Sequence, residues 1–251
     1  MFKFSGRVSP NDVLHRTTSA TPSAMSPDEH YIAPTTVSVT INTPPPEQVI
    51  GVPQYAATVT DNSSNPPYDP ATNCKGYFTS FLFQANNNCY AYACNIATNT
   101  FPQPGRQSGY LIEQNTLDGP TVMSYAEMDG LKYVGTTIED CLNYQPRHPS
   151  LNGHFVALMI SPPGDANWPG DYHWSRCDNS TGDCNQWSQK DGNDQITNFD
   201  FAGNLITDPS QANWSVNQGP ISAAPPAEPD VVVTYNFFAF MFVPFGAVKI
   251  I

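Results

Sequence analysis

Proline limits where this chain can form regular structure, because it lacks a backbone donor and fixes φ. Eleven of the 25 prolines lie within residues 1–72, in runs such as "INTPPPEQ" and "SSNPPYDP". This region is therefore predicted to be an extended or partly disordered arm rich in Pro, Ser and Thr. One run within it, "TTVSVTI" at 35–41, alternates as a strand does. Residues 73–251 are predicted to form the folded domain.

The hydrophobic period changes along residues 73–251. A helix is predicted over 87–97, with Asn87 or Asn88 as its N-cap, and a second helix over 119–131. The strands expected after them span residues 154–160, 171–177, 185–190 and 231–243. Helices followed by strands predict an α+β domain in which the first helix packs on an antiparallel sheet.

The most apolar segment is "VVVTYNFFAFMFVPFGAVKII" at 231–251. Its length is compatible with a membrane span. Polar residues, a proline and a glycine interrupt it, and β-branched and aromatic residues prevail. Two buried strands with a break at 244–246 are therefore favoured over a membrane span.

The charge of the chain disfavours two classes of partner. Only 13% of the residues are charged, and the formal net charge is −12. Nucleic-acid backbones and anionic membrane surfaces both attract clusters of Lys and Arg, which are absent here. The first residues lack the apolar core of a secretory signal peptide. Low charge and abundant Asn, Ser and Thr nevertheless indicate an extracellular, surface or virion-associated protein.

The stretch "QANNNCYAYACN" places Cys89 at the predicted start of a helix. A helix N-terminus or a neighbouring imidazolium lowers the pKa of a thiol and so activates it. His154 and His173 lie on consecutive predicted strands, and both rings can face Cys89 if these strands are antiparallel neighbours. Gln84, five residues before Cys89, is placed to donate a hydrogen bond to an oxyanion.

This order of residues resembles the papain-like cysteine hydrolase superfamily, and most of all its NlpC/P60 branch, over about residues 80–190. The resemblance implies a papain-like fold with Cys89 as nucleophile, His154 as base and His173 as the orienting residue. Gln84 is similar to the papain-type oxyanion glutamine. The implied activity is that of a cysteine peptidase or amidase acting on a peptide or peptidoglycan-like substrate, without a cofactor. The local text "NNCYAYA" differs from the Asp-Cys-Ser of that branch.

A second interpretation is a non-enzymatic structural or surface/virion binding protein whose arm docks on a protein partner by strand addition. Cys89 would then be an inert buried cysteine. A metal site formed by His154, Asp171, His173 and Cys177 is a weaker alternative, because the spacing matches no compact ligand motif. No metal is therefore predicted.

Two cysteines flank the turn sequence in "CDNSTGDC". Residues on either side of a hairpin turn lie close enough to be bridged. Cys177 and Cys184 are therefore predicted to form a disulfide where the compartment is oxidising.

Overall fold

The computed structural model describes residues 58–59, 64–69, 78, 84–113, 117–164, 168–192, 194–217, 230 and 232–251. The helices and strands are β1 Thr58–Val59, η2 Gln84–Asn86, α2 Cys89–Cys94, β2 Ile96–Ala97, η3 Arg106–Ser108, α3 Gly119–Met128, β3 Lys132–Gly135, α4 Ile138–Arg147, β4 Gly153–Ser161, β5 Asp171–Cys177, β6 Trp187–Lys190, β7 Ile196–Thr197, β8 Ser215–Asn217, β9 Val232–Thr234 and β10 Asn236–Pro244. The strand predicted at 35–41 lies outside the described residues.

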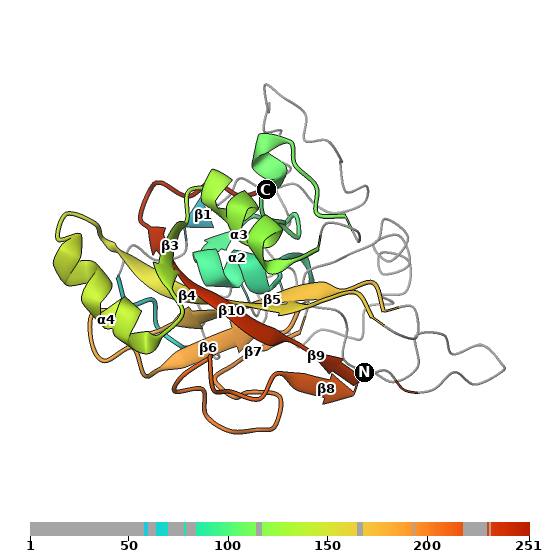
Figure 1. The fold of residues 1–251 in the computed structure, drawn as a ribbon. Helices are drawn as coiled ribbons and strands as arrows, with labels where there is room; N and C mark the ends of the chain where they lie inside the picture. Colours follow the sequence, from blue (N-terminus) through green and yellow to red (C-terminus); the bar gives the residue numbers. More distant parts are fainter. Residues whose placement is uncertain are drawn as a thin grey trace, which may run out of the picture.

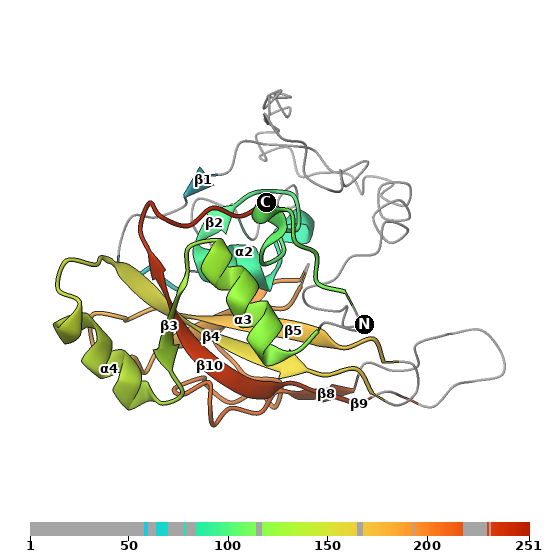
Figure 2. The same ribbon diagram turned by 45° about the horizontal axis from the view of Figure 1, so that its top comes forward.

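A six-stranded antiparallel sheet organises the domain, with the strand order β3-β10-β4-β5-β6-β7. Helices α2 and α3 lie together on one face of this sheet, and α4 lies beyond its end (Figures 1 and 2). The short β8–β9 pair forms a separate ribbon on the other side. The predicted α+β class is thus confirmed, including a first helix packed on an antiparallel sheet.

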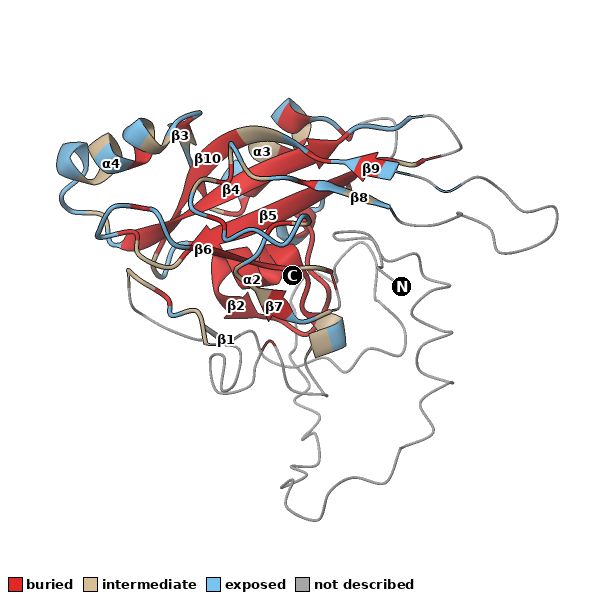
Figure 3. Ribbon diagram, turned by 90° about the horizontal axis from the view of Figure 1, so that it is seen from below, coloured by how far each residue is buried: buried red, intermediate tan, exposed pale blue. Residues whose placement is uncertain are grey.

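Both faces of the sheet are apolar, because both are covered. Val156, Leu158 and Trp174 lie in one buried cluster with residues of α2 and α3. Phe155 and Met159 lie in a second cluster, with residues of α4 and of the segment 201–216. The central strands are accordingly buried along their length (Figure 3). A side chain on one face of the sheet therefore packs in a different cluster from a side chain on the other face.

Several predicted elements are confirmed. The second helix is α3, which Asp118 caps by accepting from the backbone of Thr121 at 2.8 Å, and which ends just before Gly130 at φ +111°. The predicted strands at 154–160, 171–177 and 185–190 correspond to β4, β5 and β6. Strand β3 and helix α4 are additions that the hydrophobic pattern did not predict.

The C-terminal apolar segment forms two strands, but their positions differ from the prediction. Strand β10 ends at Pro244 and residues 245–247 form a turn, as expected, but no strand follows that turn. The second strand is β9, which precedes β10 and is separated from it at Tyr235. The Tyr235 backbone donates to the Trp214 carbonyl at 3.0 Å, and its hydroxyl donates to Asp171 at 2.8 Å. These bonds hold the point where the chain passes from one sheet to the other. No helix in the described ranges is long and apolar enough to cross a membrane.

Two described pieces of the predicted arm contact the domain. Strand β1 pairs antiparallel with β2, with Thr58 opposite Ala97. Further along, the Asn65 side chain accepts from the backbone of Thr181 at 2.9 Å. The division of the chain at residues 72 and 73 stays a prediction.

Candidate functional site

The asparagines before Cys89 have a structural role. Asn88 is the N-cap of α2, as predicted, and its side-chain oxygen accepts from the Ala91 backbone at 3.1 Å. Its amide donates to the Pro102 carbonyl at 2.7 Å. The Asn87 side chain is paired with Asn99, through the backbone N–H at 2.9 Å and the side-chain oxygen at 3.2 Å. The polar run thus starts a short buried helix and fixes the loop that follows it.

Cys89 itself is fully buried in the cluster between α2 and the sheet. Burial raises the pKa of its thiol far above the usual value, and the charge of Asp171 acts in the same direction. A thiol in such surroundings stays protonated and is a poor nucleophile. The six-residue helix does not offset this desolvation.

His154 lies on the same sheet face as Cys89, but its ring is already bonded. Its Nε2 lies 2.7 Å from the Ala93 carbonyl oxygen, which can only accept, so Nε2 carries the proton. Burial lowers the pKa of His154 to about 3, and the charge of Arg176 acts in the same direction. The ring is therefore neutral and ties β4 to the end of α2.

His173 lies on the opposite face of the sheet, so the prediction that both rings face Cys89 is wrong. Residues directly opposite each other in an antiparallel pair share a face, and His173 is opposite Met159. Its ring packs against Trp214 and Tyr235, with centroid distances of 5.5 and 5.7 Å. Burial lowers its pKa to about 4, although the hydrogen bond to Gln189 opposes this.

Gln84 is not placed as an oxyanion donor. Its side-chain oxygen accepts from Gln195 at 2.7 Å, and its carbonyl accepts from the ammonium of Lys190 at 2.6 Å. Burial lowers the pKa of Lys190 to about 7. Gln84 and Lys190 together hold the turn before α2 against β6.

Cys177 and Cys184 are buried free thiols in one apolar cluster. The Cys184 thiol donates to the Ser180 carbonyl at 3.7 Å, and the two thiols also interact with each other. Their disulfide stays a prediction. Among the described residues no three His, Cys, Asp or Glu side chains form a group that could hold a metal ion.

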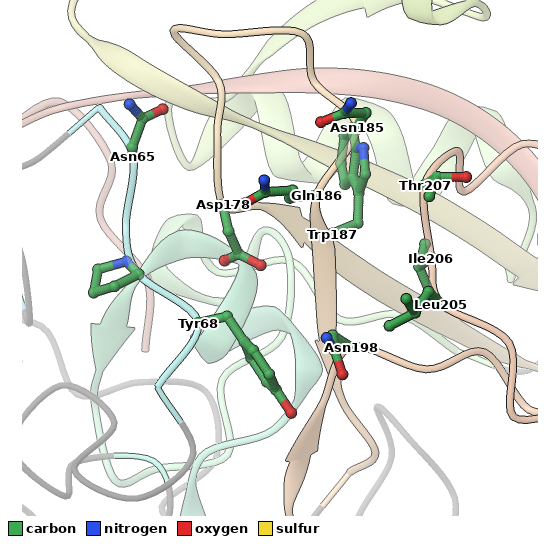
Figure 4. A pocket seen from close by; sticks show the side chains of 11 residues that line it. Asn65, Tyr68, Asp178, Asn185, Gln186, Trp187, Asn198, Leu205, Ile206 and Thr207 are labelled. Atoms are coloured by element: carbon green, nitrogen blue, oxygen red, sulfur yellow. The ribbon is translucent and has the colours of Figure 1, made fainter.

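A pocket of about 480 Å³ lies at the β6–β7 end of the sheet (Figure 4). Three segments surround it: the end of the predicted arm, the hairpin between β5 and β6, and the loop after β7. Its lining residues are Asn65, Pro67, Tyr68, Asp178, Asn185, Gln186, Trp187, Asn198, Leu205, Ile206 and Thr207. Neither Cys89 nor the two histidines line it.

No protein-family model matches the chain, and no solved structure matches it. A curated protein does: Insoluble matrix shell protein 1 of Ruditapes philippinarum is 38% identical over 141 residues. The match covers 55% of this chain and 76% of the shell protein. This chain belongs to the family of that shell matrix protein.

Membership of the shell matrix family overturns the hydrolase prediction. The matched protein is a matrix component by name, not a peptidase, thiol protease or amidase. The predicted cysteine-dependent cleavage of a peptide or peptidoglycan-like substrate is therefore corrected. The roles assigned to Cys89, His154, His173 and Gln84 depended on that activity and are not carried further.

Arg176 is a buried residue at the contact between β5 and α2 that the sequence pattern did not reveal. It is fully buried, and its guanidinium donates to the Tyr92 hydroxyl at 2.8 Å and to the Pro67 carbonyl at 3.1 Å. It also forms an ion pair with Asp178 at 3.2 Å and lies over the Tyr92 ring, 3.9 Å from its centroid. The sequence gives no periodic signal for its burial, because strand β5 also carries the polar residues Asp171, His173 and Ser175, which are buried as well.

Proposed function

We propose that this member of the shell matrix family is a non-catalytic structural component of an extracellular matrix. The observation that carries this proposal is the 38% identity to Insoluble matrix shell protein 1 over 76% of its length. An extracellular setting agrees with the low charge of the chain and its abundance of Asn, Ser and Thr.

The geometry around Cys89 supports a structural role. The thiol is buried and protonated, and the ring proton of His154 is bonded to a backbone carbonyl. The domain thus acts as a scaffold, because its buried polar side chains form hydrogen bonds with other residues of the domain. The part of the chain before residue 73 remains the proposed contact with protein partners.

The excess of carboxylates supports assembly controlled by charge. The chain has 22 Asp and Glu against 10 Lys and Arg. Mutual repulsion keeps such a chain soluble at neutral pH, and neutralisation permits association. Loss of charge is therefore the proposed trigger for entry into an insoluble matrix.

The test is the fraction of purified full chain that sediments as the pH is lowered from 8 towards the sequence pI of 4.5. We expect the pelleted fraction to rise steeply and the pellet to redissolve at pH 8 as a folded monomer. Cys89→Ala should assemble as the wild type does. Persistent solubility over this range, together with amide hydrolysis that Cys89→Ala abolishes, would contradict the proposal.

The thiol of Cys89 gives a second, independent prediction. In the folded protein its alkylation by iodoacetamide should be roughly a hundredfold slower than in guanidinium chloride, because reaction requires local opening. Peptide mass spectrometry at pH 7 and 8.5 measures both rates. His154→Gln, which retains a donor for the Ala93 carbonyl, is the matched variant and should not slow the labelling. Fast labelling of the folded wild type that His154→Gln suppresses would indicate an activated thiolate.

A further inference from the structure

The pocket at the β6–β7 end of the sheet carries no net positive charge that would attract an anion. Its lining contains no lysine or arginine, and its one carboxylate is Asp178. The Asp178 side chain is only 5% exposed and is paired with the fully buried Arg176 at 3.2 Å. The charge of this carboxylate is balanced from behind, so the pocket offers a neutral surface to a ligand.

The backbone around the pocket is already hydrogen-bonded. The N–H of Asp178 donates to Gln186 at 2.8 Å, that of Trp187 to Ile206 at 3.2 Å, and that of Ile206 to Asn198 at 3.0 Å. An extended peptide that adds as a strand needs free backbone groups along an edge. The main chain here does not offer that row, so strand addition is disfavoured at this site.

The groups that remain are side-chain amides and hydroxyls. Asn185 and Gln186 are exposed, and Asn198 is half-buried. Within the described residues, the side chains of Gln186 and Asn198 and the amide nitrogen of Asn185 make no hydrogen bond. Thr207 and the hydroxyl of Tyr68 add groups that both donate and accept. Figure 4 shows these side chains on three separate segments around one space.

Apolar surface lies beside these polar groups. Trp187 and Ile206 are buried beneath the pocket, Leu205 is 59% exposed, and Tyr68 presents a partly exposed ring. A volume of about 480 Å³ is within the range of sites that enclose a small ligand. Uncharged amides around an aromatic ring match a ligand that has many hydroxyl or acetamido groups and apolar C–H faces.

We propose that this pocket binds a neutral polysaccharide, and that it attaches the protein to that polymer in the matrix. Sugar hydroxyls would exchange hydrogen bonds with the amides of Gln186, Asn185 and Asn198, while a sugar ring lies against Tyr68. The proposal deepens and rests on the structural matrix role, because it supplies the polymer to which a matrix protein is anchored.

The test is calorimetric titration of the full chain at pH 7 with cellopentaose and with an N-acetylglucosamine pentamer. We expect saturable binding of at least one of them. The double variant Gln186→Ala/Asn198→Ala should weaken it by roughly tenfold or more, since two hydrogen bonds are lost. Gln107→Ala, which removes an exposed amide that does not line the pocket, is the matched control and should bind as the wild type does.

Dextran sulfate and an uncharged Gly-Ser-Thr peptide test the other ligand classes. Preference for either over both neutral sugars, or wild-type affinity in the double variant, would overturn the proposal. No saturable sugar binding would overturn it as well. The sedimentation assay, run on the same samples, separates the two proposals. Normal assembly without sugar binding contradicts the pocket proposal alone, whereas loss of both contradicts the matrix role too.

Discussion

Replacing Arg176 with methionine should destabilise the protein by about 3–5 kcal/mol, since removal of one partner leaves an uncompensated buried charge. The guanidinium joins β5 to Asp178, to Tyr92 on α2 and to Pro67. Methionine replaces the aliphatic part of the side chain but none of the donors. Urea unfolding followed by tryptophan fluorescence at pH 7.5 measures the loss.

The pH of that measurement is chosen from the pKa of Asp178, the ion-pair partner of Arg176. Burial raises the pKa of Asp178 to about 6, against the opposing effect of Arg176. At pH 7.5 this carboxylate is charged in the wild type. In Arg176→Met its pKa rises further, so the loss of stability contains the cost of an unpaired buried charge or of the uptake of a proton. Arg176→Met/Asp178→Asn should recover part of the loss, because the remaining side chain is neutral. Arg147→Met, at the exposed end of α4, is the control and should change stability by less than about 0.5 kcal/mol. Equal losses in Arg176→Met and the double variant would show that the ion pair is not the cause.

Local signals in the sequence predicted local structure well. The N-cap at Asn88 was readable because a side-chain acceptor before a small-residue helix has a direct effect within three residues. A similar signal was available for α4, where Thr137 and Asp140 form a capping box. Pro146 and the residues that follow it favour a loop, and this opposing signal masks the capping box.

The relation between strands could not be read in the same way. Alternation places His154 with Val156, and His173 with Ser175, but it does not say which of these sets faces the helix. That depends on register, and a shift by one residue exchanges the faces. The pairing of Met159 with His173 puts the two rings on opposite faces. The predicted triad therefore failed where tertiary information is required, namely the faces of the two strands and the burial of Cys89.

Burial of charge was the other fact beyond the sequence pattern. Arg176 and Lys190 lie in strands whose residues are all buried, although single charged residues in a strand usually mark a solvent-facing side. Apart from Asp178, which is two residues from Arg176, their partners come from distant segments: Pro67 and Tyr92 for Arg176, and Gln84 for Lys190. Contacts separated by about a hundred residues leave no periodic trace.

The buried histidines predict a loss of stability in acid. In the folded protein the pKa is about 3 for His154 and about 4 for His173, against 6.5 for an ordinary histidine. Protons therefore bind the unfolded chain first. The stabilising contribution of each ring is complete above about pH 6.5 and declines as the pH falls towards 4 and 3. Each histidine should cost about 1.4 kcal/mol per pH unit within that window.

The dependence of wild-type stability on pH does not reveal this effect by itself, because buried carboxyls change the stability in the opposite direction as the pH falls. Burial raises the pKa of Asp129 and of Asp191 to about 7. The folded state takes up these protons before the unfolded chain does, so their contribution grows as the pH falls from 7. The two effects offset each other between about pH 6.5 and 4, and a difference between variants is needed to separate them.

His154→Gln/His173→Gln removes both titrating rings while keeping a side-chain donor at each position. We expect this variant to be less stable than the wild type at pH 7.5. The difference between their free energies of unfolding should narrow by several kcal/mol by pH 4.5, because only the wild type then loses the histidine contribution. Asp129→Asn serves as the control of opposite sign. It removes a carboxyl that accepts hydrogen bonds from the Tyr90 hydroxyl at 2.8 Å and from the Gly105 backbone at 2.9 Å. The free energy of unfolding of the wild type should increase relative to that of Asp129→Asn as the pH falls over the same range. Urea unfolding at pH 7.5, 6.5, 5.5 and 4.5 measures all three proteins. If the stability difference between the histidine variant and the wild type does not change with pH, the rings are solvated and titrate normally in the folded state. That result would also reopen the reactivity of the Cys89 thiol, which lies on the same face of the sheet as His154.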